Sequence, residues 1–178
     1  MDRIDRRTLE RFESAMLPHL DSAHNLARWM TGDEHDAVDV VQESMVRALR
    51  GFHGYHGGDA RSWLLTIVRN TGATWLRRNR SGAAASLPDD AADQIASTAP
   101  EPPALAIRAA TAQRLRQAIE DLPSEFREVF VLRELEGLSY KEIAQVAGLP
   151  MGTVMSRLAR ARQRLAEVLS AAPELAGG

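Results

Sequence analysis

Hydrophobic and polar positions repeat with a helical period along most of the chain, most clearly between residues 139 and 165. Ser139 precedes Glu142 by three residues, the signature of a capping box, so a helix is expected to begin there. Gly148 predicts its end, and Pro150 and the following glycine predict a turn before a second helix restarts. Apolar residues then recur at spacings of four, three and four, at Val154, Leu158, Ala161 and Leu165. The pattern predicts a helix-turn-helix, with Thr153 opening the second helix.

The opposite face of this second helix is basic. Between residues 150 and 166 the chain has four arginines and no acid, so the balanced acid–base pairing of an ordinary solvated helix is missing. Arginine can bind a guanine edge with two hydrogen bonds or clamp a phosphate, and hydroxyls add short hydrogen bonds. A solvated arginine-rich face in a helical bundle is the alternative, but the composition favours duplex DNA binding. The expected DNA-facing residues are Thr153, Ser156, Arg157, Arg160 and Arg164.

A second amphipathic helix is predicted in the first half of the chain, in the run DEHDAVDVVQESMVRALRGF. Acids at its start suit the helix dipole. The spacing assigns Val41, Met45, Ala48 and Phe52 to the buried face. The outer face carries Asp39, Gln42, Glu43 and Arg50, and a charged outer face is usually only solvated.

A glycine-rich loop, FHGYHGGDA, follows this helix. Rings on a loop can stack on unpaired bases, although a plain turn fits the residues equally well. The next segment, ARSWLLTIVRNTGATWLRRNR, predicts a helix with a polar face that contains Asn70. Asparagine has no propensity reason to lie inside a helix, so Asn70 beside arginines is a candidate for reading a base. The buried stripe is expected to be Trp63, Leu64, Ile67, Val68 and Trp75.

Composition divides the chain into two domains. Residues 81–103 are rich in alanine, proline and serine and contain four acids and no base, which is typical of a flexible linker. Alanine and leucine dominate elsewhere, which favours helices. We therefore predict an all-α fold with two small helical domains at 1–80 and 104–170, the second containing the helix-turn-helix, and a tail at 171–178.

Several function classes are disfavoured by residue content. The chain has no cysteine, which excludes disulfides and thiolate catalysis and favours a cytoplasmic address. No histidine pair has the spacing of a catalytic zinc helix, and no nucleophile motif or phosphate loop is present, so we expect no enzyme activity, no cofactor and no metal. No apolar run is long enough to cross a membrane. The formal net charge of −2 argues against indiscriminate nucleic-acid binding and hides the local basic surface.

Three segments together resemble the extracytoplasmic-function branch of bacterial RNA polymerase sigma factors. They are DVVQESMVRALRGF, SWLLTIVRNTGATWLRR and LPSEFREVFVLRELEGLSYKEIAQVAGLPMGTVMSRLARARQRL. Their order matches regions 2 and 4 of that family, with a linker between them. The resemblance implies a subunit that binds core RNA polymerase and directs initiation at promoters, melting the minus-ten element and reading the minus-thirty-five duplex.

The resemblance also implies roles for individual residues. The polymerase clamp is expected to contact Asp39, Gln42 and Glu43. The minus-ten element is expected to contact Tyr55, His56, Arg69, Asn70, Arg77 and Arg78. In the second domain the family's duplex-contacting positions fall on Met155, Ser156, Ala159 and Arg160, with Arg157 nearby. Met155 and Ala159 are apolar where the family often carries polar or aromatic residues, which puts the preferred minus-thirty-five sequence in doubt.

The resemblance adds an anti-sigma factor to the expected partners, besides polymerase and both duplex and melted promoter DNA. The free protein is expected to be monomeric. Two alternatives are a stand-alone helix-turn-helix regulator, which leaves the Asn70 region without purpose, and a sigma-like decoy for an anti-sigma factor. Such decoys usually lose the DNA-facing arginines, which this chain keeps.

The linker leads to a first prediction. As a flexible coil residues 81–103 would span about 25 Å, and fully extended roughly 75 Å. In the family that the chain resembles, the two promoter elements lie about one and a half duplex turns apart, which is on the order of 50 Å. We therefore expect the two domains not to be rigidly fixed relative to each other in the free protein. Spin-label distance measurements on the free chain test this, and a single unchanging distance would contradict it.

Overall fold

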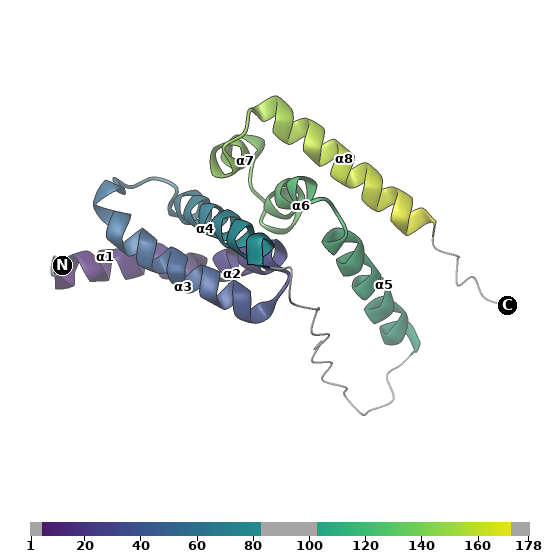
Figure 1. The fold of residues 1–178 in the computed structure, drawn as a ribbon, viewed down its shortest axis with the longest axis horizontal. Helices are drawn as coiled ribbons and strands as arrows, with labels where there is room; N and C mark the ends of the chain where they lie inside the picture. Colours follow the sequence, from purple (N-terminus) through teal and green to yellow (C-terminus); the bar gives the residue numbers. More distant parts are fainter. Residues whose placement is uncertain (1–4, 83–102, 172–178) are drawn as a thin grey trace.

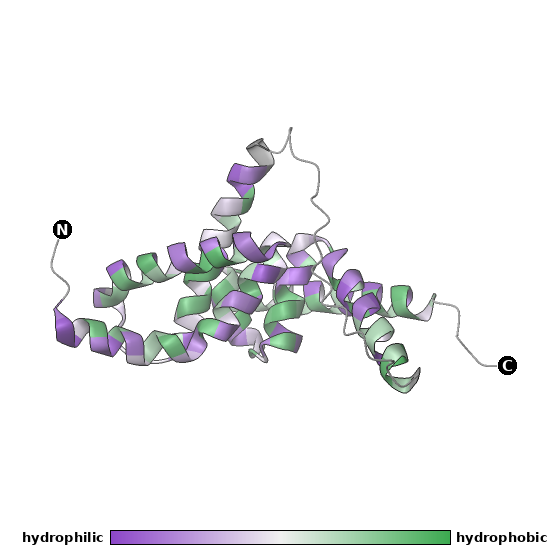
Figure 2. Cartoon of the chain, turned by 90° about the horizontal axis from the view of Figure 1, so that it is seen from below, coloured by the Kyte–Doolittle hydropathy of each residue, from purple (hydrophilic) through white to green (hydrophobic). Residues whose placement is uncertain are grey.

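The structure is a computed structural model that describes residues 5–82 and 103–171, and within these residues it contains helices and no strand. The predicted linker (81–103) and tail (171–178) lie almost entirely outside the described residues. The described part confirms the all-α fold with two helical domains (Figure 1). In Figure 2 the helices carry both hydrophobic and hydrophilic positions along their length, as amphipathic packing requires.

The first domain is a bundle in which α2, α3 and α4 pack against one another. Asp5 and Asp33 cap the first and third helices, each accepting a hydrogen bond from a backbone N–H three residues later. Gly32 ends α2 in the left-handed conformation, with φ of 77°. The elements are α1 (Arg6–Met16), η1 (Leu17–His19), α2 (Leu20–Thr31), α3 (Glu34–Gly51), η2 (Phe52–Gly54) and α4 (Ala60–Gly82).

The second domain contains the helix-turn-helix. A short helix is followed directly by a π-helical turn, in which the N–H of Glu136 donates to the carbonyl of Val131 at 3.0 Å. The wider turn lets the chain reverse before α7. The elements are α5 (Pro103–Glu120), α6 (Ser124–Phe130), the π-helical turn η4 (Val131–Leu135), α7 (Tyr140–Ala147) and α8 (Met151–Ser170).

The two domains are packed against each other through α4, which lies between α3 and α7, and through α2, which contacts α6 (Figure 1). One continuous cluster of buried apolar side chains includes Leu64 and Val68 of the first domain and Leu132 and Ile143 of the second. The sequence predicted domains that are not rigidly fixed, whereas the structure shows them in direct contact. That the domains are not rigidly fixed in the free protein stays a prediction. The contact between them joins residues that are far apart in sequence, and no local pattern relates these residues.

The inner face of α3 is wider than the sequence predicted. Val41 and Met45 are only half-buried, whereas Val40 and Ser44 are buried. The hydroxyl of Ser44 donates to the carbonyl of Val40 at 2.6 Å, so this serine is buried without leaving its hydroxyl unpaired. Val41 and Met45 pack against the core as predicted but are only partly buried, while Ala48 and Phe52 are buried as predicted.

A core substitution should destabilise the whole molecule. Leu64 is fully buried in the shared cluster, so Leu64→Ala should lower the free energy of unfolding by about 3 kcal/mol through lost transfer energy and a residual cavity. Urea denaturation monitored by circular dichroism measures the change. Leu105→Ala, on the exposed side of α5, is the matched control and should stay within about 0.5 kcal/mol of the wild type. Equal effects of the two substitutions would contradict the assignment of Leu64 to the core.

Candidate nucleic-acid and polymerase interface

The turn between α7 and α8 has the geometry that the sequence predicted. The side chain of Ser139 accepts a hydrogen bond from the N–H of Glu142 at 3.2 Å, and the carboxylate of Glu142 accepts from the N–H of Ser139 at 2.6 Å. Gly148 has φ of 65°, a left-handed conformation that favours glycine and ends α7. The second helix begins at Met151, two residues earlier than expected, because Pro150 serves as its N-cap residue and Gly152 is tolerated in the first turn.

We call the side of α8 opposite its buried apolar stripe the reading face, because its side chains are the ones expected to contact DNA. The apolar stripe is buried as predicted, at Val154, Leu158, Ala161 and Leu165. Ser156, Arg160 and Arg164 are exposed, and Met155 has an exposed fraction of 51%. Thr153 is half-buried. The face that the sequence assigned to duplex DNA is therefore accessible over the first half of α8.

The four arginines of α8 differ in the contacts that their side chains make. Arg162 donates to the Glu134 carboxylate at 2.5 and 3.0 Å, which directs it away from the reading face. Arg157 is half-buried and lies 3.8 Å from Glu125, and Arg164 lies over the ring of Phe126 at 5.2 Å. Within the part of the chain that the structure describes, Arg160 makes no hydrogen bond or ion pair, so its guanidinium fork is available to a base edge or a phosphate.

The predicted minus-ten residues fall on two parts of the first domain. Asn70 and Arg78 are exposed on α4, and Arg77 donates to the hydroxyl of Thr74 at 3.1 Å. Arg69, two turns after Ser62, is directed elsewhere: its Nε lies 2.5 Å from the Glu128 carboxylate of the second domain. In this arrangement Arg69 is therefore only partly exposed and is paired with an acid, unlike the exposed Asn70.

The glycine-rich loop carries the other two predicted minus-ten residues. His56 is exposed, whereas the Tyr55 ring stacks on Phe52 with centroids 5.5 Å apart and contacts Trp63 at 5.2 Å. The Tyr55 hydroxyl donates to the carbonyl of Gly58 at 3.0 Å, which closes the loop. The ring is thus part of an aromatic cluster and presents only one edge to solvent.

A groove of about 480 Å³ opens beside this loop. Tyr55 and His56 line it together with Thr8 and Arg11, which come from α1. The guanidinium of Arg11 lies 5.9 Å from the centroid of the Phe52 ring. Sequence reasoning missed Thr8 and Arg11 because their proximity to the loop is a tertiary contact between segments that show no common pattern.

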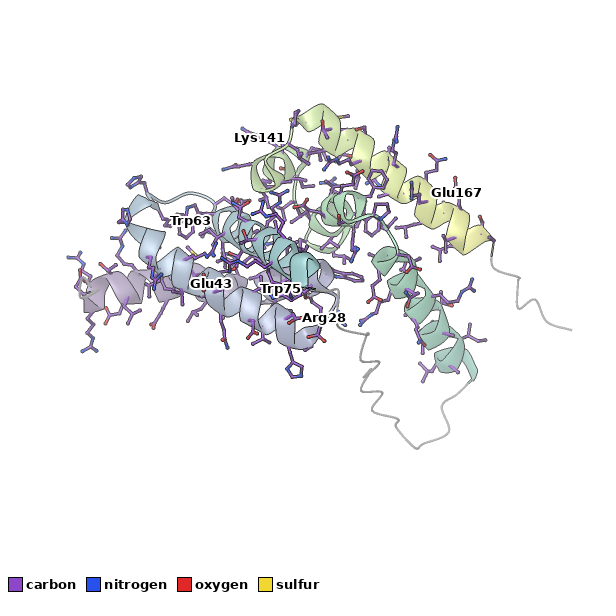
Figure 3. The ribbon with its side chains drawn as sticks, in the orientation of Figure 1. Arg28, Glu43, Trp63, Trp75, Lys141 and Glu167 are labelled. Atoms are coloured by element: carbon purple, nitrogen blue, oxygen red, sulfur yellow. The ribbon has the colours of Figure 1, made fainter. Side chains whose placement is uncertain are left out.

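The acidic face of α3 is exposed as expected. Asp39, Gln42 and Glu43 are exposed, and the Glu43 carboxylate accepts from Arg47 at 2.7 Å. That hydrogen bond holds the pKa of Glu43 below its usual value, so the residue carries its charge at neutral pH. Figure 3 shows Glu43 and Trp75 on the neighbouring helices α3 and α4. A groove of about 310 Å³ between these helices is lined by Asp39, Glu43, Trp75 and Arg78, so predicted polymerase and minus-ten residues meet there.

A third hollow is lined by one residue from each of the two predicted DNA surfaces. It measures about 200 Å³, lies between the domains, and is lined by Arg69 of α4 and Arg157 of α8. The rest of its wall is mostly apolar and includes Trp29 and Val131. In this arrangement the two surfaces that are expected to read separate promoter elements therefore adjoin one cavity.

Among the described residues, no group of three or more histidine, aspartate or glutamate side chains is placed to hold a metal ion. No helix in the described ranges is long and apolar enough to cross a bilayer.

Two family models match the chain in the expected order. Sigma-70 region 2 matches residues 16–82 and Sigma-70 region 4 matches residues 112–165. The chain is 31% identical over 176 residues to the RNA polymerase sigma-H factor of Pseudomonas aeruginosa, covering 95% of this chain and 91% of the relative. This chain belongs to the extracytoplasmic-function sigma factors. It is 33% identical over 166 residues to the ECF RNA polymerase sigma factor SigE of Mycolicibacterium smegmatis, covering 93% of this chain and 64% of the relative.

Two solved structures share the fold. The sigma factor RpoE in complex with the anti-sigma factor NepR, from Bartonella quintana, superposes with a TM-score of 0.72 at 25% identity, covering 91% of this chain and 98% of that one. CnrH in complex with the cytosolic domain of CnrY superposes with a TM-score of 0.61 at 26% identity, covering 92% and 90%. The arrangement of the helices in this sigma factor is therefore one that its relatives adopt.

The cap of α4 makes the stability of this sigma factor depend on pH. Asp59 accepts hydrogen bonds from the hydroxyl and, at 3.1 Å, the backbone N–H of Ser62. The bond from the hydroxyl contributes most to holding the pKa of Asp59 below its usual value. A carboxyl with a lowered folded-state pKa stabilises the fold above its unfolded value of about 3.9, and this contribution is lost as pH falls through the lower folded value.

Asp59→Asn removes this titration. Asparagine can still cap the helix, so only the interaction of the charge with the helix dipole is lost. The wild type should exceed the variant in unfolding free energy by about 0.5 kcal/mol at pH 7, and the difference should shrink at about pH 2 to 3. Urea unfolding at both pH values measures it. Asp39→Asn is the control, since Asp39 is exposed beyond the first turn of α3 and makes no hydrogen bond within the described residues. A difference that stays constant with pH would show that Asp59 does not stabilise α4 through its charge.

Proposed function

We propose that this sigma factor binds core RNA polymerase and directs promoter-specific initiation through two reading surfaces, one on each domain. The observation that carries the proposal is that a single chain presents an exposed Asn70 on α4 and an exposed Arg160 on α8. Region 2 and region 4 family models match the two domains that hold these residues. A stand-alone helix-turn-helix regulator would need only the second.

The polar surfaces suggest how the steps are divided. Asn70, Arg77 and Arg78 on α4, with Tyr55 and His56 at the groove beside the loop, would hold the melted minus-ten strand. Flipping a base out of the stack costs a few kcal/mol, which a preformed groove can offset by stacking and hydrogen bonding. Thr153, Met155, Ser156, Arg157, Arg160 and Arg164 on α8 would contact the minus-thirty-five duplex. Asp39, Gln42 and Glu43 on α3 would dock on the polymerase clamp.

The proposal assigns residues 1–80 to promoter melting and polymerase binding, 81–103 to the linker, and 104–170 to duplex recognition. The chain acts as an initiation subunit without chemistry of its own, in the cytoplasm with the polymerase. An anti-sigma factor is a further partner, because the sigma factor RpoE, whose structure shares this fold, was determined in complex with the anti-sigma factor NepR. The decoy alternative is disfavoured because the exposed Arg160 would have no role in it.

The test is reconstitution with core RNA polymerase on genomic DNA fragments. The purified protein should co-elute with core polymerase and allow it to initiate at discrete sites. Asn70→Ala and Arg160→Ala should each reduce that initiation roughly tenfold or more, since a specific base contact contributes about 1–3 kcal/mol. Both variants should still co-elute with core polymerase, because neither residue lies on the acidic face of α3.

Arg162→Ala is the matched control for Arg160→Ala. It removes an arginine from the same helix, but one that Glu134 holds away from the reading face, so initiation should stay within about twofold of the wild type. DNA binding without co-elution with core polymerase would instead identify a stand-alone regulator.

A further inference from the structure

Helix α1 carries arginines at positions where they do not stabilise it. Arg6 and Arg7 lie in its first turn, which contains no acid, although the dipole of a helix favours negative charge there. Asp5 caps the helix, but both of its carboxylate oxygens accept hydrogen bonds from Thr8. Arg7 and Arg11 are one turn apart on the same face, where like charges repel each other. The stability of α1 therefore gives no reason for Arg7 and Arg11.

The three arginines of α1 differ in whether an acid neutralises them. The Nε of Arg6 donates to the carboxylate of Glu10 at 3.0 Å. Arg7 and Arg11 are both exposed, and within the part of the chain that the structure describes their guanidinium groups make no hydrogen bond or ion pair. Two unpaired cations thus remain on one face of α1, where they are available to an anion.

An aromatic contact holds this face of α1 beside the glycine-rich loop. The ring of Phe12 is buried and meets the ring of Phe52 edge to face, with centroids 5.3 Å apart and planes at 89°. Arg11 precedes Phe12 in the chain, and its guanidinium lies 5.9 Å from the centroid of the same Phe52 ring. Because buried rings fix where α1 lies against the loop, Arg11 is placed in advance beside the residues that are expected to hold the melted minus-ten strand.

Two neighbouring hollows lie along this contact between α1 and the loop. The groove of about 480 Å³ described above is lined by Tyr55 and His56 of the loop. A further hollow of about 380 Å³ is lined by Arg7 of α1. Arg11, Phe52 and Tyr55 line both, so the two hollows share a wall. Each volume falls in the range of about 300–1,000 Å³ that is typical of small-ligand sites, so each hollow has room for a unit the size of one nucleotide.

The charge around the two hollows suits a phosphate backbone. Among the described residues that line either hollow, Glu10 is the only acid, and Arg6 binds it. Arg7 and Arg11 therefore give this surface an excess of positive charge next to the aromatic wall of Phe52 and Tyr55. Proteins that bind single-stranded nucleic acids combine cations that follow the backbone with aromatic side chains that contact the bases.

We propose that α1 binds the sugar-phosphate backbone of the melted minus-ten strand, with Arg11 on the phosphate between the nucleotides in the two hollows and Arg7 on a neighbouring phosphate. These contacts add affinity that does not depend on sequence and leave base recognition to the loop and Asn70. They form only with a strand that has left the duplex, so they shift the promoter toward its melted state. The inference rests on the proposed function, because it names the α1 residues that hold the same strand.

The backbone contacts are tested with the full chain bound to core RNA polymerase. The probe is a fluorescein-labelled single strand with the non-template sequence of an initiation site, and fluorescence anisotropy measures its binding. The double variant Arg7→Ala, Arg11→Ala should bind about tenfold more weakly at about 0.1 M salt. It should also reduce the slope of log affinity against log salt concentration by about 0.7 for each arginine, because each lost phosphate contact releases fewer counterions.

Lysine substitutions distinguish a backbone contact from a base contact or a loss of structure. Arg7→Lys, Arg11→Lys keeps both charges but loses the planar fork that binds a base edge with two hydrogen bonds. This variant should recover the salt slope of the wild type, and all variants should have the same helix content by circular dichroism. Binding by the lysine variant as weak as that of the alanine variant would overturn the assignment to phosphates.

Arg108→Ala, Arg114→Ala is the control with the same change of net charge. Both arginines are exposed on α5, which lies on the other side of the molecule from α1 (Figure 1). Charges separated by more than about 10 Å are largely screened at 0.1 M salt, so binding should stay within about twofold of the wild type. Equal weakening in the two double alanine variants would show that only net charge matters and would overturn the site on α1.

Co-elution with core polymerase separates failure of this inference from failure of the proposed function. Arg7→Ala, Arg11→Ala should co-elute like the wild type, and loss of co-elution would assign the arginines to a polymerase contact and overturn the DNA site. Unchanged strand binding in a complex that initiates would overturn the inference and leave the function intact.

A wild-type protein that binds no core polymerase would overturn the function. Binding of the free chain to a mixed-sequence single strand at low salt would then decide the inference, because backbone contacts need no particular sequence. A wild type that binds this strand no better than the alanine variant would overturn it.

Discussion

The buried carboxylate of Glu136 is the interaction on which the relative placement of the two domains depends. An acid at this depth is tolerated only because Arg61 and Asn25 meet it, and those residues come from two different helices of the other domain. Apolar packing brings α4 and α7 together without choosing one precise register, since hydrophobic contact is non-directional. The hydrogen bonds to the Glu136 carboxylate are directional, so they select one register between the two domains. Helix α4 consequently serves two roles, as the centre of the first domain and as the surface that receives the second.

Local patterns predicted what is local in this molecule. The capping box at Ser139, the left-handed Gly148 and the buried stripe through Leu158 all lie within one helical turn or one tight turn of the residues that determine them. The sequence did not predict Ser44 as a buried position of α3 because serine is polar, and only its hydrogen bond to the carbonyl one turn earlier allows it to lie inside. A periodic pattern shows whether a side chain is polar or apolar. It does not show the hydrogen bond that allows a polar side chain to be buried.

The candidate site was harder to predict where it depends on distant contacts. Exposure of Asn70 and Arg160 follows from helix phase, so both were identified correctly as accessible. Arg69 has the same guanidinium group as Arg77 and Arg78, but it is held by Glu128, a residue 59 positions away in sequence. Likewise, the proximity of Arg11 to the glycine-rich loop depends on how α1 packs. Such pairings are invisible in a single sequence because no repeat or spacing links the partners.

The continuous apolar cluster that joins the domains affects how this protein behaves in solution. Its members belong to both halves of the chain, so separating the halves uncovers apolar surface on α4 and α7 that water does not solvate favourably. A chain that opens without meeting another surface would tend to self-associate through these patches. Solubility during overproduction should therefore depend on the supply of binding partners.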